Sequence, residues 1–367
     1  MDDRKQQLAE IIDPLLNWFD GHKRILPWRE EPTPYRVWVS EIMLQQTRVE
    51  AVKPYYERFM NELPTVESLA NAKEDTLLKL WEGLGYYNRV RNLQKAAIEV
   101  IEDFGGNIPD EFEELLKLPG IGRYTAGAVA SIAYGKAVPA VDGNVLRVIT
   151  RVLLDDSDIL KQSVKNQMEL ILREIMTKER PGDFNQALME LGAMVCVPNG
   201  APKCEQCPLQ FLCKAREQGV MEQYPKKTPK KKRVIINKTI FIIRDGEKTV
   251  LHKRGNKGLL AGMYEFPNVE GHLSIDEALE VIKSLDFAPI RIQELEAAKH
   301  IFSHREWHMK AYAIKIEHSD LDREDDFFFA YSSETENKYP IPSAFYAYTK
   351  YLNIRIGNEK FLGEIEP

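Results

Sequence analysis

A short basic run divides the chain into two parts with different hydrophobic patterns. Residues 226–233, with the sequence KKTPKKKR, carry six basic side chains, no acidic ones and a proline, so this run cannot join a hydrophobic core. Apolar residues recur at helical spacing before the run and alternate in short segments after it. The contrast predicts two domains, residues 1–224 and 234–367, joined by a linker over residues 225–233. The linker is either simply solvated or also lies along nucleic-acid phosphates.

The first part of the chain reads as helices. Its apolar residues lie three or four positions apart, glycine and proline separate the segments, and no alternating β-branched run interrupts them. This pattern predicts an all-α first domain. The expected helices cover residues 6–19, 34–45, 48–60, 74–82, 88–104, 111–117, 123–134, 143–154, 160–175 and 184–195.

The part after the linker has a mixed pattern that predicts an α+β domain. It combines alternating segments, a tight-turn signal and helical runs, one of which opens with a capping box. The expected elements are a hairpin of residues 238–243 and 249–254 around Asp245-Gly246, a helix over 275–285 capped by Ser274 and Glu277, a strand over 309–317 and a last helix over 341–352.

The composition of the chain excludes several classes of protein. With 367 residues, 44% of them hydrophobic, the chain is globular rather than disordered, and its formal charge of −6 excludes a bulk polycation. No apolar run approaches the roughly 20 residues that span a bilayer, and no apolar stretch follows a basic start at the N-terminus. Four cysteines are too few for a disulfide scaffold. We therefore expect a cytoplasmic protein without a signal peptide.

All four cysteines lie in one short stretch near the end of the first domain: Cys196, Cys204, Cys207 and Cys213. Their spacing is C-x7-C-x2-C-x5-C, in a stretch that prolines and a glycine keep irregular. Thiols gathered in this way predict a four-thiolate metal site rather than four unrelated buried thiols. The residues alone leave zinc and a 4Fe-4S cluster open. The single C-x2-C pair favours the cluster, because zinc ribbons usually have two such pairs.

A glycine-rich turn, LPGIG at residues 118–122, joins two expected helices. Its glycines leave the backbone N–H groups of Gly120, Ile121 and Gly122 open at the start of the second helix, where a DNA phosphate can bind. An ordinary tight turn between helices would have the same sequence pattern.

Two carboxylates are candidates for chemistry. Asp142 precedes the helix expected over 143–154, so it is either a plain N-cap or a fixed anion that stabilises a cationic transition state, because the helix dipole favours its ionised form. Glu41 lies in an almost entirely apolar helix. Burial is expected to raise its pKa and keep it protonated near neutral pH, although a core glutamate bonded to backbone is the alternative. A neutral acid paired with a carboxylate is the combination that breaks glycosidic bonds.

These motifs resemble the helix–hairpin–helix DNA glycosylase superfamily, and more finely the adenine DNA glycosylases of the MutY type. The resemblance covers nearly the whole chain, and its second domain is similar to a Nudix fold. The motifs that carry it are LPWR (26–29), WVSEIMLQQT (38–47), LWEGLGYYNR (80–89), LPGIGRYTAGAV (118–129), VPAVDGNV (138–145), FNQALMELGAMVC (184–196), KGLLAGMYEFP (257–267) and FSH (302–304).

The resemblance implies a monofunctional, monomeric glycosylase of base excision repair. It would act on double-stranded DNA, flip out an adenine mispaired with 8-oxoguanine or guanine, and hydrolyse its N-glycosidic bond. Glu41 would protonate adenine on N7, and Asp142 would stabilise an oxocarbenium-like sugar, with Tyr124 and Asn144 beside this pair. Related lyases have a lysine where this chain has Tyr124, so no Schiff base is expected.

The resemblance also implies binding roles. They are the adenine pocket of Arg24, Leu26, Trp28, Arg29 and Gln186; the duplex probes Gln46, Thr47, Leu84 and Tyr86; the 8-oxoguanine-reading loop Phe302, Ser303 and His304; and the 4Fe-4S ligands Cys196, Cys204, Cys207 and Cys213.

Two departures and two alternatives accompany this interpretation. The helix over 275–285 carries only Asp276, Glu277 and Glu280 in place of the metal-binding Nudix glutamates, so a nucleotide-pool hydrolase is disfavoured. The first two cysteines are separated by seven residues instead of the family's usual six, and Lys203 is the only basic residue between them. Because this loop has so few basic residues, we expect salt to weaken DNA binding less than it would with a more basic loop. The alternative of a non-catalytic lesion binder would leave the paired carboxylates without a role.

Overall fold

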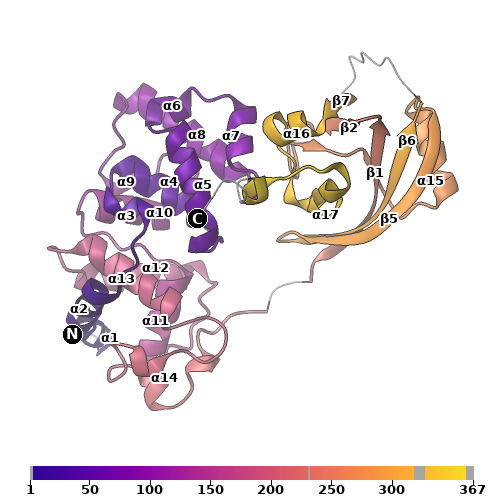
Figure 1. Ribbon diagram of the computed structural model, residues 1–367. Coiled ribbons are helices and arrows are strands. Elements are labelled where there is room, and N and C mark those ends of the chain that lie inside the picture. The colour runs from indigo at the N-terminus through magenta and orange to yellow at the C-terminus, as the bar shows by residue number, and fades with distance from the viewer. Residues whose placement is uncertain (1–2, 230–231, 318–326, 361–367) are drawn as a thin grey trace. The chain divides into compact units, whose positions relative to one another are not determined.

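The computed structural model describes residues 3–229, 232–317 and 327–360 (Figure 1). These residues form two compact units, one of residues 1–71 and 92–230 and one of residues 72–91 and 231–367. Lys230 and Lys231 of the predicted linker lie outside the described residues. No helix in the described part of the chain is long and apolar enough to cross a membrane.

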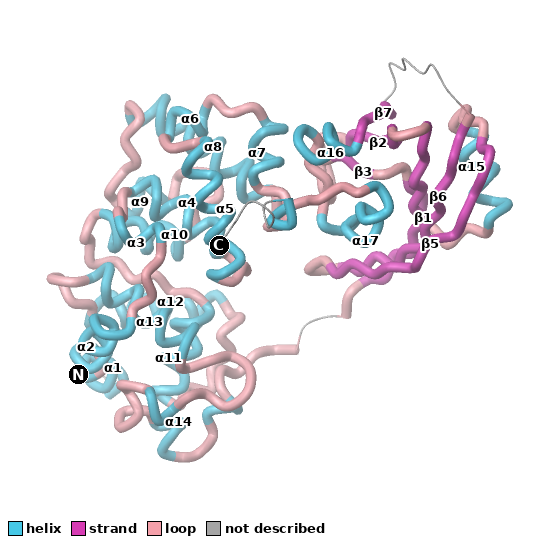
Figure 2. Tube along the Cα trace, in the orientation of Figure 1, coloured by secondary structure: helices cyan, strands magenta, loops and turns pink. Residues whose placement is uncertain are grey.

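The first unit is built from helices, and all strands of the described residues lie in the second unit (Figure 2). An all-α first domain is therefore confirmed. The helices are α1 (Asp3–Glu10), α2 (Ile12–His22), α3 (Pro27–Glu30), α4 (Pro34–Leu44), α5 (Val49–Glu62), α6 (Val66–Ala70), most of α8 (Asn88–Phe104), α9 (Phe112–Leu115), α10 (Arg123–Ala128), α11 (Gly143–Leu153), α12 (Gln162–Ile175), α13 (Pro181–Met194) and α14 (Lys214–Glu217), with short turns η1 (Val129–Ala133), η2 (Cys204–Gln206) and η3 (Met221–Gln223).

Two of the predicted helices are wrong as single elements. The helix expected over 6–19 is divided into α1 and α2, because Pro14 has no N–H to donate to the carbonyl of Glu10. The helix expected over 123–134 changes at Val129 from α10 into a π-helical turn, η1. There the Ser131 hydroxyl donates to the carbonyl of Gly127 at 2.7 Å and competes with the backbone ladder.

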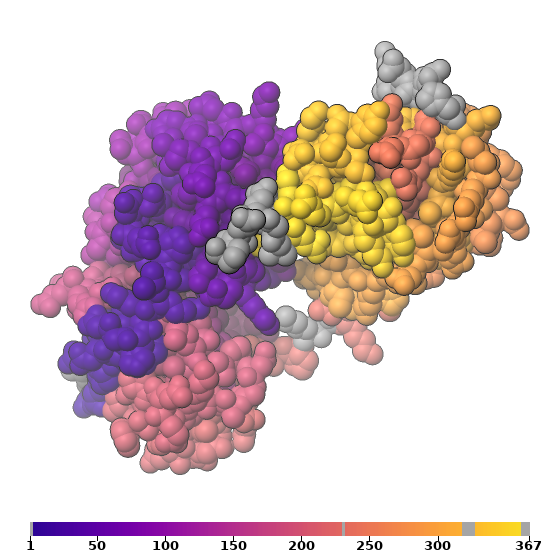
Figure 3. Space-filling model, in the orientation of Figure 1, coloured from indigo at the N-terminus to yellow at the C-terminus, as the bar shows by residue number. Residues whose placement is uncertain are grey.

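The core of the first unit lies where α2, α11, α12 and α13 meet. Phe19, Ile149, Phe184 and Leu188 are among its fully buried side chains. In Figure 3 the indigo N-terminal helices lie against the pink helices of this same unit. Burial of the apolar stripes of these helices fixes the start of α11 and the inner face of α13, on which several candidate site residues lie.

The second unit is a mixed β-sheet with helices on both faces, which confirms the predicted α+β class. The sheet order is β3-β2-β1-β6-β5, with β4 also paired to β1 and β7 to β2; β1 and β6 run parallel and the other pairs are antiparallel. The elements are α7 (Glu74–Leu80), β1 (Val234–Asp245), β2 (Lys248–Lys253), β3 (Tyr264–Glu265), β4 (Asn268–Glu270), α15 (Ile275–Ser284), β5 (Pro289–Ile301), β6 (Arg305–Ile316), β7 (Phe327–Tyr331), α16 (Ser332–Lys338), α17 (Tyr346–Thr349) and the turns η4 (Ser343–Phe345), η5 (Lys350–Leu352) and η6 (Gly357–Lys360).

Both faces of this sheet are buried. Tyr312 and Ile314 of β6 pack with Ile282 of α15 on one face, as their alternation predicts. Trp307 and Met309 of the same strand pack with the segment from Ile341 to Ile356 on the other face. The hairpin of β1 and β2 and the Ser274–Glu277 capping box are also confirmed.

Several elements of the second unit differ from the sequence prediction, and β3, β4, β7 and α16 have no counterpart in it. The helix expected over 341–352 is wrong as a single element, because the chain there forms the short pieces η4, α17 and η5 after Pro340 and Pro342. The long strand β5 has no counterpart among the predicted elements. It lies at the sheet edge and is mostly exposed or half-buried, so it lacks the apolar alternation that identifies a strand.

Candidate active site

Glu41 lies on α4, a helix whose residues are buried on nearly every side. Thr33 caps the start of α4 and Pro34 follows in its first turn, so the two residues fix where this apolar helix begins. The Glu41 side chain is only 6% exposed, and the Tyr124 hydroxyl of α10 donates a hydrogen bond to its Oε2 at 2.5 Å. Burial raises the pKa of Glu41 to about 7, more than the Tyr124 hydrogen bond lowers it. The carboxyl is therefore suited to carry a proton near neutral pH.

Asp142 caps the N-terminus of α11 in the same unit. Its Oδ1 accepts from the backbone N–H of Val145 at 2.8 Å, and its Oδ2 accepts from the Asn144 side-chain amide at 2.7 Å. Burial raises the pKa of Asp142 above its ordinary value, while these hydrogen bonds and the charge of Arg147 lower it. The contacts suit a carboxylate, and its ionised state at neutral pH stays a prediction.

The two carboxyl groups interact electrostatically. The charge of Asp142 raises the pKa of Glu41, and burial together with both carboxylates raises the pKa of Tyr124, so Tyr124 stays a neutral hydrogen-bond donor. Gly192 of α13 allows the start of α11 to pack closely, because a Cβ at this position would lie 2.6 Å from the Cβ of Asn144. The structure thus brings Glu41, Asp142, Tyr124 and Asn144 into one site.

Arg147 of α11 was not predicted and connects this site to the cysteine stretch. It is 5% exposed, and its Nη2 donates to Asn144 Oδ1 and to the carbonyl of Gly192, both at 2.8 Å. Its Nε donates to the carbonyl of Cys196 at 2.7 Å. A cation on the buried side of a predicted helix, one turn after Asp142, was the available sequence signal.

Three residues predicted for the adenine pocket, Arg24, Arg29 and Gln186, form a hydrogen-bonded group with a glutamate that the sequence analysis missed. Glu190 of α13 is 2% exposed and accepts from Arg24 Nε at 2.7 Å and from Arg29 Nη2 at 3.0 Å. Burial alone would raise the pKa of Glu190, but the hydrogen bonds of the two guanidinium groups outweigh it and lower the pKa to about 2. Arg29 Nε also donates to Gln186 Oε1 at 2.8 Å. Glu190 lies one helical turn after Gln186, a spacing that could have identified it.

Two further residues predicted for the adenine pocket lie at α3, and two predicted duplex probes lie directly after α4. Leu26 and Trp28 are 2% and 5% exposed, at the start of α3, and Trp28 packs edge-on against Tyr56 with 5.3 Å between ring centroids. Gln46 is exposed directly after α4, in a left-handed conformation with φ of 60°, and the Thr47 hydroxyl donates to the carbonyl of Gln45 at 3.4 Å. The two polar residues therefore lie at the chain reversal that follows the helix of Glu41.

The predicted phosphate-binding turn is a tight hairpin between α9 and α10. The N–H of Ile121 donates to the carbonyl of Leu118 at 3.2 Å, and Gly120 has a φ of 77°. A Cβ at Gly120 would lie 2.7 Å from the Cβ of Asn92, so both backbone and space require glycine there. Gly120 and Gly122 are exposed while Ile121 is buried. The turn therefore presents its glycines to solvent and anchors itself through Ile121.

The predicted reading loop and two of the duplex probes lie in the second unit. Phe302 packs edge-on against Trp307 with 4.9 Å between ring centroids and its N–H donates to the carbonyl of Arg305 at 2.9 Å, so the loop is a tight turn before β6. Ser303 and His304 are exposed. The structure brings Ser303 to Tyr86, with 2.9 Å between their hydroxyl oxygens, whereas Leu84 is buried beside it.

The four cysteines line one cavity together with Arg151 and Arg216. Cys196 follows α13, Cys204 and Cys207 lie at the two ends of η2, and Cys213 caps α14, so three places along the chain supply the thiols. Arg151 Nη1 donates to the Cys196 sulfur at 3.1 Å. Four thiols with neighbouring cations are a donor set that fits a metal group of high negative charge.

The acidic residues of α15 have structural roles in the second unit. Glu277 Oε2 accepts from the N–H and hydroxyl of Ser274 at 2.7 and 2.8 Å, which completes the capping box. Glu280 is paired with Lys283 at 3.0 Å on the exposed face of the helix. Neither contact gathers carboxylates around a common point.

Comparisons with known proteins agree with this geometry. Residues 39–174 match the family model of HhH-GPD superfamily base excision DNA repair proteins, and residues 239–351 match the NUDIX domain model. The structure is similar to a thermostable thymine-DNA glycosylase, with a TM-score of 0.54 and 29% identity over 59% of this chain and all of that one. It is also similar to an endonuclease III in a non-covalent DNA complex, with a TM-score of 0.50 and 28% identity over 59% of this chain and 97% of that one.

Curated relatives cover both units. The chain is 36% identical to the adenine DNA glycosylase of Homo sapiens over 83% of its own length and 66% of the human enzyme's. It is 36% identical to that of Rattus norvegicus over 83% and 70%, and 35% identical to that of Buchnera aphidicola from Schizaphis graminum over 80% and 84%.

The fold, the site and these matches define an enzyme of the DNA glycosylase class, as the sequence motifs predicted. Within that class, the identity to relatives over most of their length shows the particular family. The chain belongs to the adenine DNA glycosylase family.

Proposed function

We propose that this protein hydrolyses the N-glycosidic bond of adenine mispaired with 8-oxoguanine or guanine in double-stranded DNA, as a monomer. The observation that carries the proposal is the pairing of a buried carboxyl group, whose pKa is raised to about 7, with a capped carboxylate in the same site. A neutral acid beside an anion is the arrangement that glycosidic cleavage requires.

The chemistry follows from the two environments. Adenine leaves the duplex and reaches the site, because chemistry on its glycosidic bond is not possible within the stack. Glu41 donates its proton to N7 of adenine, so that the bond between C1′ and N9 breaks with its electrons on a neutral base. Asp142 stabilises the positive charge that develops on the deoxyribose, and a water molecule deprotonated by Glu41 adds to C1′.

Tyr124 and Asn144 hold these groups in their roles. Tyr124 donates to Glu41 and leaves the second carboxyl oxygen for the base, while Asn144 donates to Asp142 and orients it toward the sugar. Tyr124 lies where a lyase needs an amine, and a phenol cannot form a Schiff base. The enzyme is therefore monofunctional in this proposal, and the product strand carries an intact abasic site.

Recognition is divided between several surfaces in this proposal. Arg24, Leu26, Trp28, Arg29 and Gln186 form the adenine pocket. Gln46, Thr47, Leu84 and Tyr86 probe the duplex, the hairpin Gly120, Ile121 and Gly122 binds a phosphate through backbone N–H groups, and Phe302, Ser303 and His304 read 8-oxoguanine. Ser303→Ala should then lower the preference for 8-oxoguanine over guanine opposite adenine more than it lowers the rate of adenine release.

We assign the four-cysteine cavity to a 4Fe-4S cluster held by Cys196, Cys204, Cys207 and Cys213. The four thiols line one cavity, and their single C-x2-C pair favours a cluster over a zinc ribbon. Such a cluster would cross-link the turns between α13 and α14. Brown protein with about four iron and four sulfide per chain would support the assignment, and stoichiometric zinc would contradict it.

Product analysis tests the proposed reaction. A duplex with one adenine opposite 8-oxoguanine should release free adenine and leave an alkali-labile, uncut strand. Glu41→Gln and Asp142→Asn should each lose product formation while keeping DNA binding, since neither change removes a basic residue. Efficient trapping of a protein–DNA adduct with borohydride would contradict a monofunctional enzyme.

A further inference from the structure

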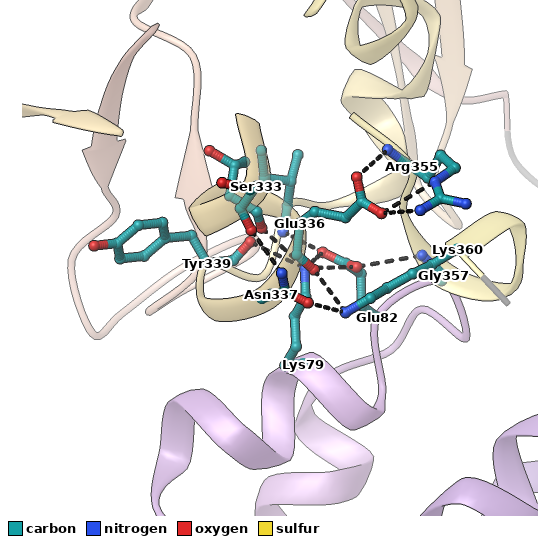
Figure 4. Close-up of polar contacts among 12 residues, drawn as sticks. Lys79, Glu82, Ser333, Glu336, Asn337, Tyr339, Arg355, Gly357 and Lys360 are labelled. Atoms are coloured by element: carbon teal, nitrogen blue, oxygen red, sulfur yellow. Dashed lines mark hydrogen bonds and ion pairs between the residues drawn. The ribbon is translucent and has the colours of Figure 1, made fainter. Parts of the chain in front are cut away.

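The second unit contains a buried ion pair whose residues come from the early part of the sequence. Lys79 and Glu82 lie in and just after α7, and their side chains are 13% and 2% exposed. Both carboxylate oxygens of Glu82 accept from Lys79 Nζ, at 3.0 and 2.9 Å. Figure 4 shows this pair beneath the C-terminal segments of the unit.

Both side chains of the pair also bond to backbone of the C-terminal segments. Glu82 Oε1 accepts from the N–H of Ile341 at 2.7 Å and Oε2 from that of Gly357 at 3.2 Å. Lys79 Nζ donates to the carbonyls of Thr335 and Tyr339 at 3.2 and 3.3 Å. The Lys79–Glu82 pair thus bonds to backbone in α16, in the residues directly after α16 and at the start of η6 (Figure 4).

Contacts at both ends of residues 72–91 continue the same attachment. Asp75 accepts from Lys253 Nζ at 3.2 Å and from the Tyr264 hydroxyl at 3.2 Å. Arg91 donates to the carbonyl of Ala261 and to Glu74 Oε1, the latter at 2.7 Å. The segment is therefore attached to the rest of the second unit near both ends as well as at the Lys79–Glu82 pair.

The pair ends at a loop whose shape is tightly constrained. Gly83, Gly85 and Tyr86 all have positive φ, of 102°, 68° and 50°. The Trp81 indole donates to the carbonyl of Gly85 at 3.1 Å, and Arg89 Nη2 donates to the same carbonyl at 3.1 Å. A non-glycine residue at positive φ, such as Tyr86, persists only where its surroundings hold it.

This loop presents Tyr86 to the predicted reading loop. The Tyr86 side chain is 50% exposed and its hydroxyl meets that of Ser303 at 2.9 Å. Only three residues lie between Glu82 and Tyr86, so a shift at the buried carboxylate is passed to the Tyr86 ring through a short, strained segment.

We propose that Glu82 is a positioning residue for recognition of the base opposite adenine: the buried Lys79–Glu82 pair makes residues 72–91 an integral part of the second unit and fixes Tyr86 against Ser303. The inference rests on the proposed function. It adds that the duplex probe Tyr86 and the 8-oxoguanine-reading loop belong to the same unit, positioned by a pair that touches neither DNA nor the reacting atoms.

The physical basis is the cost of an incomplete buried network. Loss of the Glu82 charge leaves the Lys79 ammonium buried without its counter-ion and weakens two backbone N–H bonds. The exposed pair Glu280–Lys283 has the same spacing on α15 of the same unit, but its side chains are 75% and 59% exposed. Removal of such a surface pair changes little, so Glu280→Gln is the matched control for Glu82→Gln.

The test compares single-turnover adenine release from duplexes with adenine opposite 8-oxoguanine and opposite guanine, normalised to active enzyme. Glu82→Gln should lower the ratio of the two rates about tenfold, since small misplacements of recognition groups have effects of this size. The rate opposite guanine should stay within about twofold of the wild type, and Glu280→Gln should leave the ratio unchanged. Hydrogen exchange of residues 83–86 and 302–304 should accelerate in Glu82→Gln alone.

A purely structural role would lower both rates together and leave the ratio intact. Should Glu82→Gln fold poorly, Glu82→Asp keeps the charge beside Lys79 but shortens its reach to Ile341 and Gly357, and it should lower the ratio by a smaller factor. An unchanged ratio and unchanged exchange in these variants would overturn the inference. If the wild type shows no preference for 8-oxoguanine, the proposed recognition fails separately, and the exchange of residues 83–86 decides the inference alone.

Discussion

Two buried glutamates of the first unit have pKa values that their surroundings shift in opposite directions. Glu41 on α4 accepts a hydrogen bond from the Tyr124 phenol, and burial raises its pKa to about 7. Glu190 on α13 is also buried, at 2% exposure, yet Arg24 and Arg29 lower its pKa to about 2. Burial alone therefore does not make a glutamate an acid catalyst; the partners that the fold supplies decide it.

The difference in pKa suits the two glutamates to different roles in the proposed function, Glu41 to chemistry and Glu190 to binding. A carboxyl that holds its proton near neutral pH can give it to a departing base. A carboxylate that stays ionised at neutral pH holds two guanidinium groups in place, where the proposed function assigns them to binding adenine. Sequence position alone does not reveal this, because both residues lie in segments that are apolar on most sides.

Removal of the proton donor should have the largest effect. We expect Glu41→Gln to lower single-turnover adenine release by about a thousandfold, within the range that general acid catalysis contributes. DNA affinity should stay near the wild-type value. The exposed Glu57→Gln on α5 is the control, and a Glu41→Gln enzyme that keeps most of its rate would end the role assigned to Glu41.

The pH dependence of the wild-type rate should follow the protonation of Glu41. Because the acid form is the active one, the rate should be high below about pH 7 and fall about tenfold for each unit above it. The measurement is adenine release under single-turnover conditions at several pH values. A rate that rises through neutral pH would identify a base, not an acid, as the group that matters.

Neutralising the other glutamate should have a smaller effect with a different signature. Glu190→Gln leaves Arg24 and Arg29 without their shared counter-ion, so the pocket should bind adenine less well and adenine release should fall about tenfold. The midpoint of the pH profile should stay near its wild-type value, because Glu190 does not supply the proton. A shifted midpoint would show that the two regions are not independent.

The smallest expected effects are on the free energy of unfolding. The contributions of Glu41 and Glu190 to it change in opposite directions with pH. Glu41 binds a proton more tightly in the folded state, so its contribution is fully present below its ordinary pKa of 4.5 and is lost as pH rises through about 7. Glu190 binds a proton less tightly, so its contribution is present above 4.5 and is lost as pH falls through about 2. Each contributes on the order of 3 kcal/mol at most.

Chemical denaturation of the wild type and the two glutamine variants at several pH values measures these contributions. The difference between wild type and Glu41→Gln should change between about pH 4.5 and 7, and that for Glu190→Gln between about pH 2 and 4.5. Equal pH dependence in both variants would mean that the two environments do not differ as described.

The sequence predicted much of this molecule for identifiable reasons. Helices with strong periodicity, such as those at 143–154 and 160–175, were found within a few residues, because their apolar stripes pack into the core. The burial of Glu41 and the N-cap position of Asp142 were predicted because an acid within an apolar helix and an acid just before a helix each have a local signal. Arg147 and Glu190 were missed because their importance comes from partners far along the chain.

The remaining failures also have a local cause. The edge strand β5 and the broken segment after Ile341 have no regular alternation or helical stripe to recognise. The attachment of residues 72–91 to the second unit depends on backbone groups of Ile341 and Gly357, which carry no sequence signal at all.

The most direct test of the contrast between the two regions is the ionisation of Glu41 itself. Infrared difference spectra between wild type and Glu41→Gln, recorded from about pH 4 to pH 9, isolate this one carboxyl group. We predict a protonated carboxyl band that persists until about pH 7. A carboxylate already formed at the ordinary glutamate pKa of 4.5 would contradict the role of Glu41 as the proton donor.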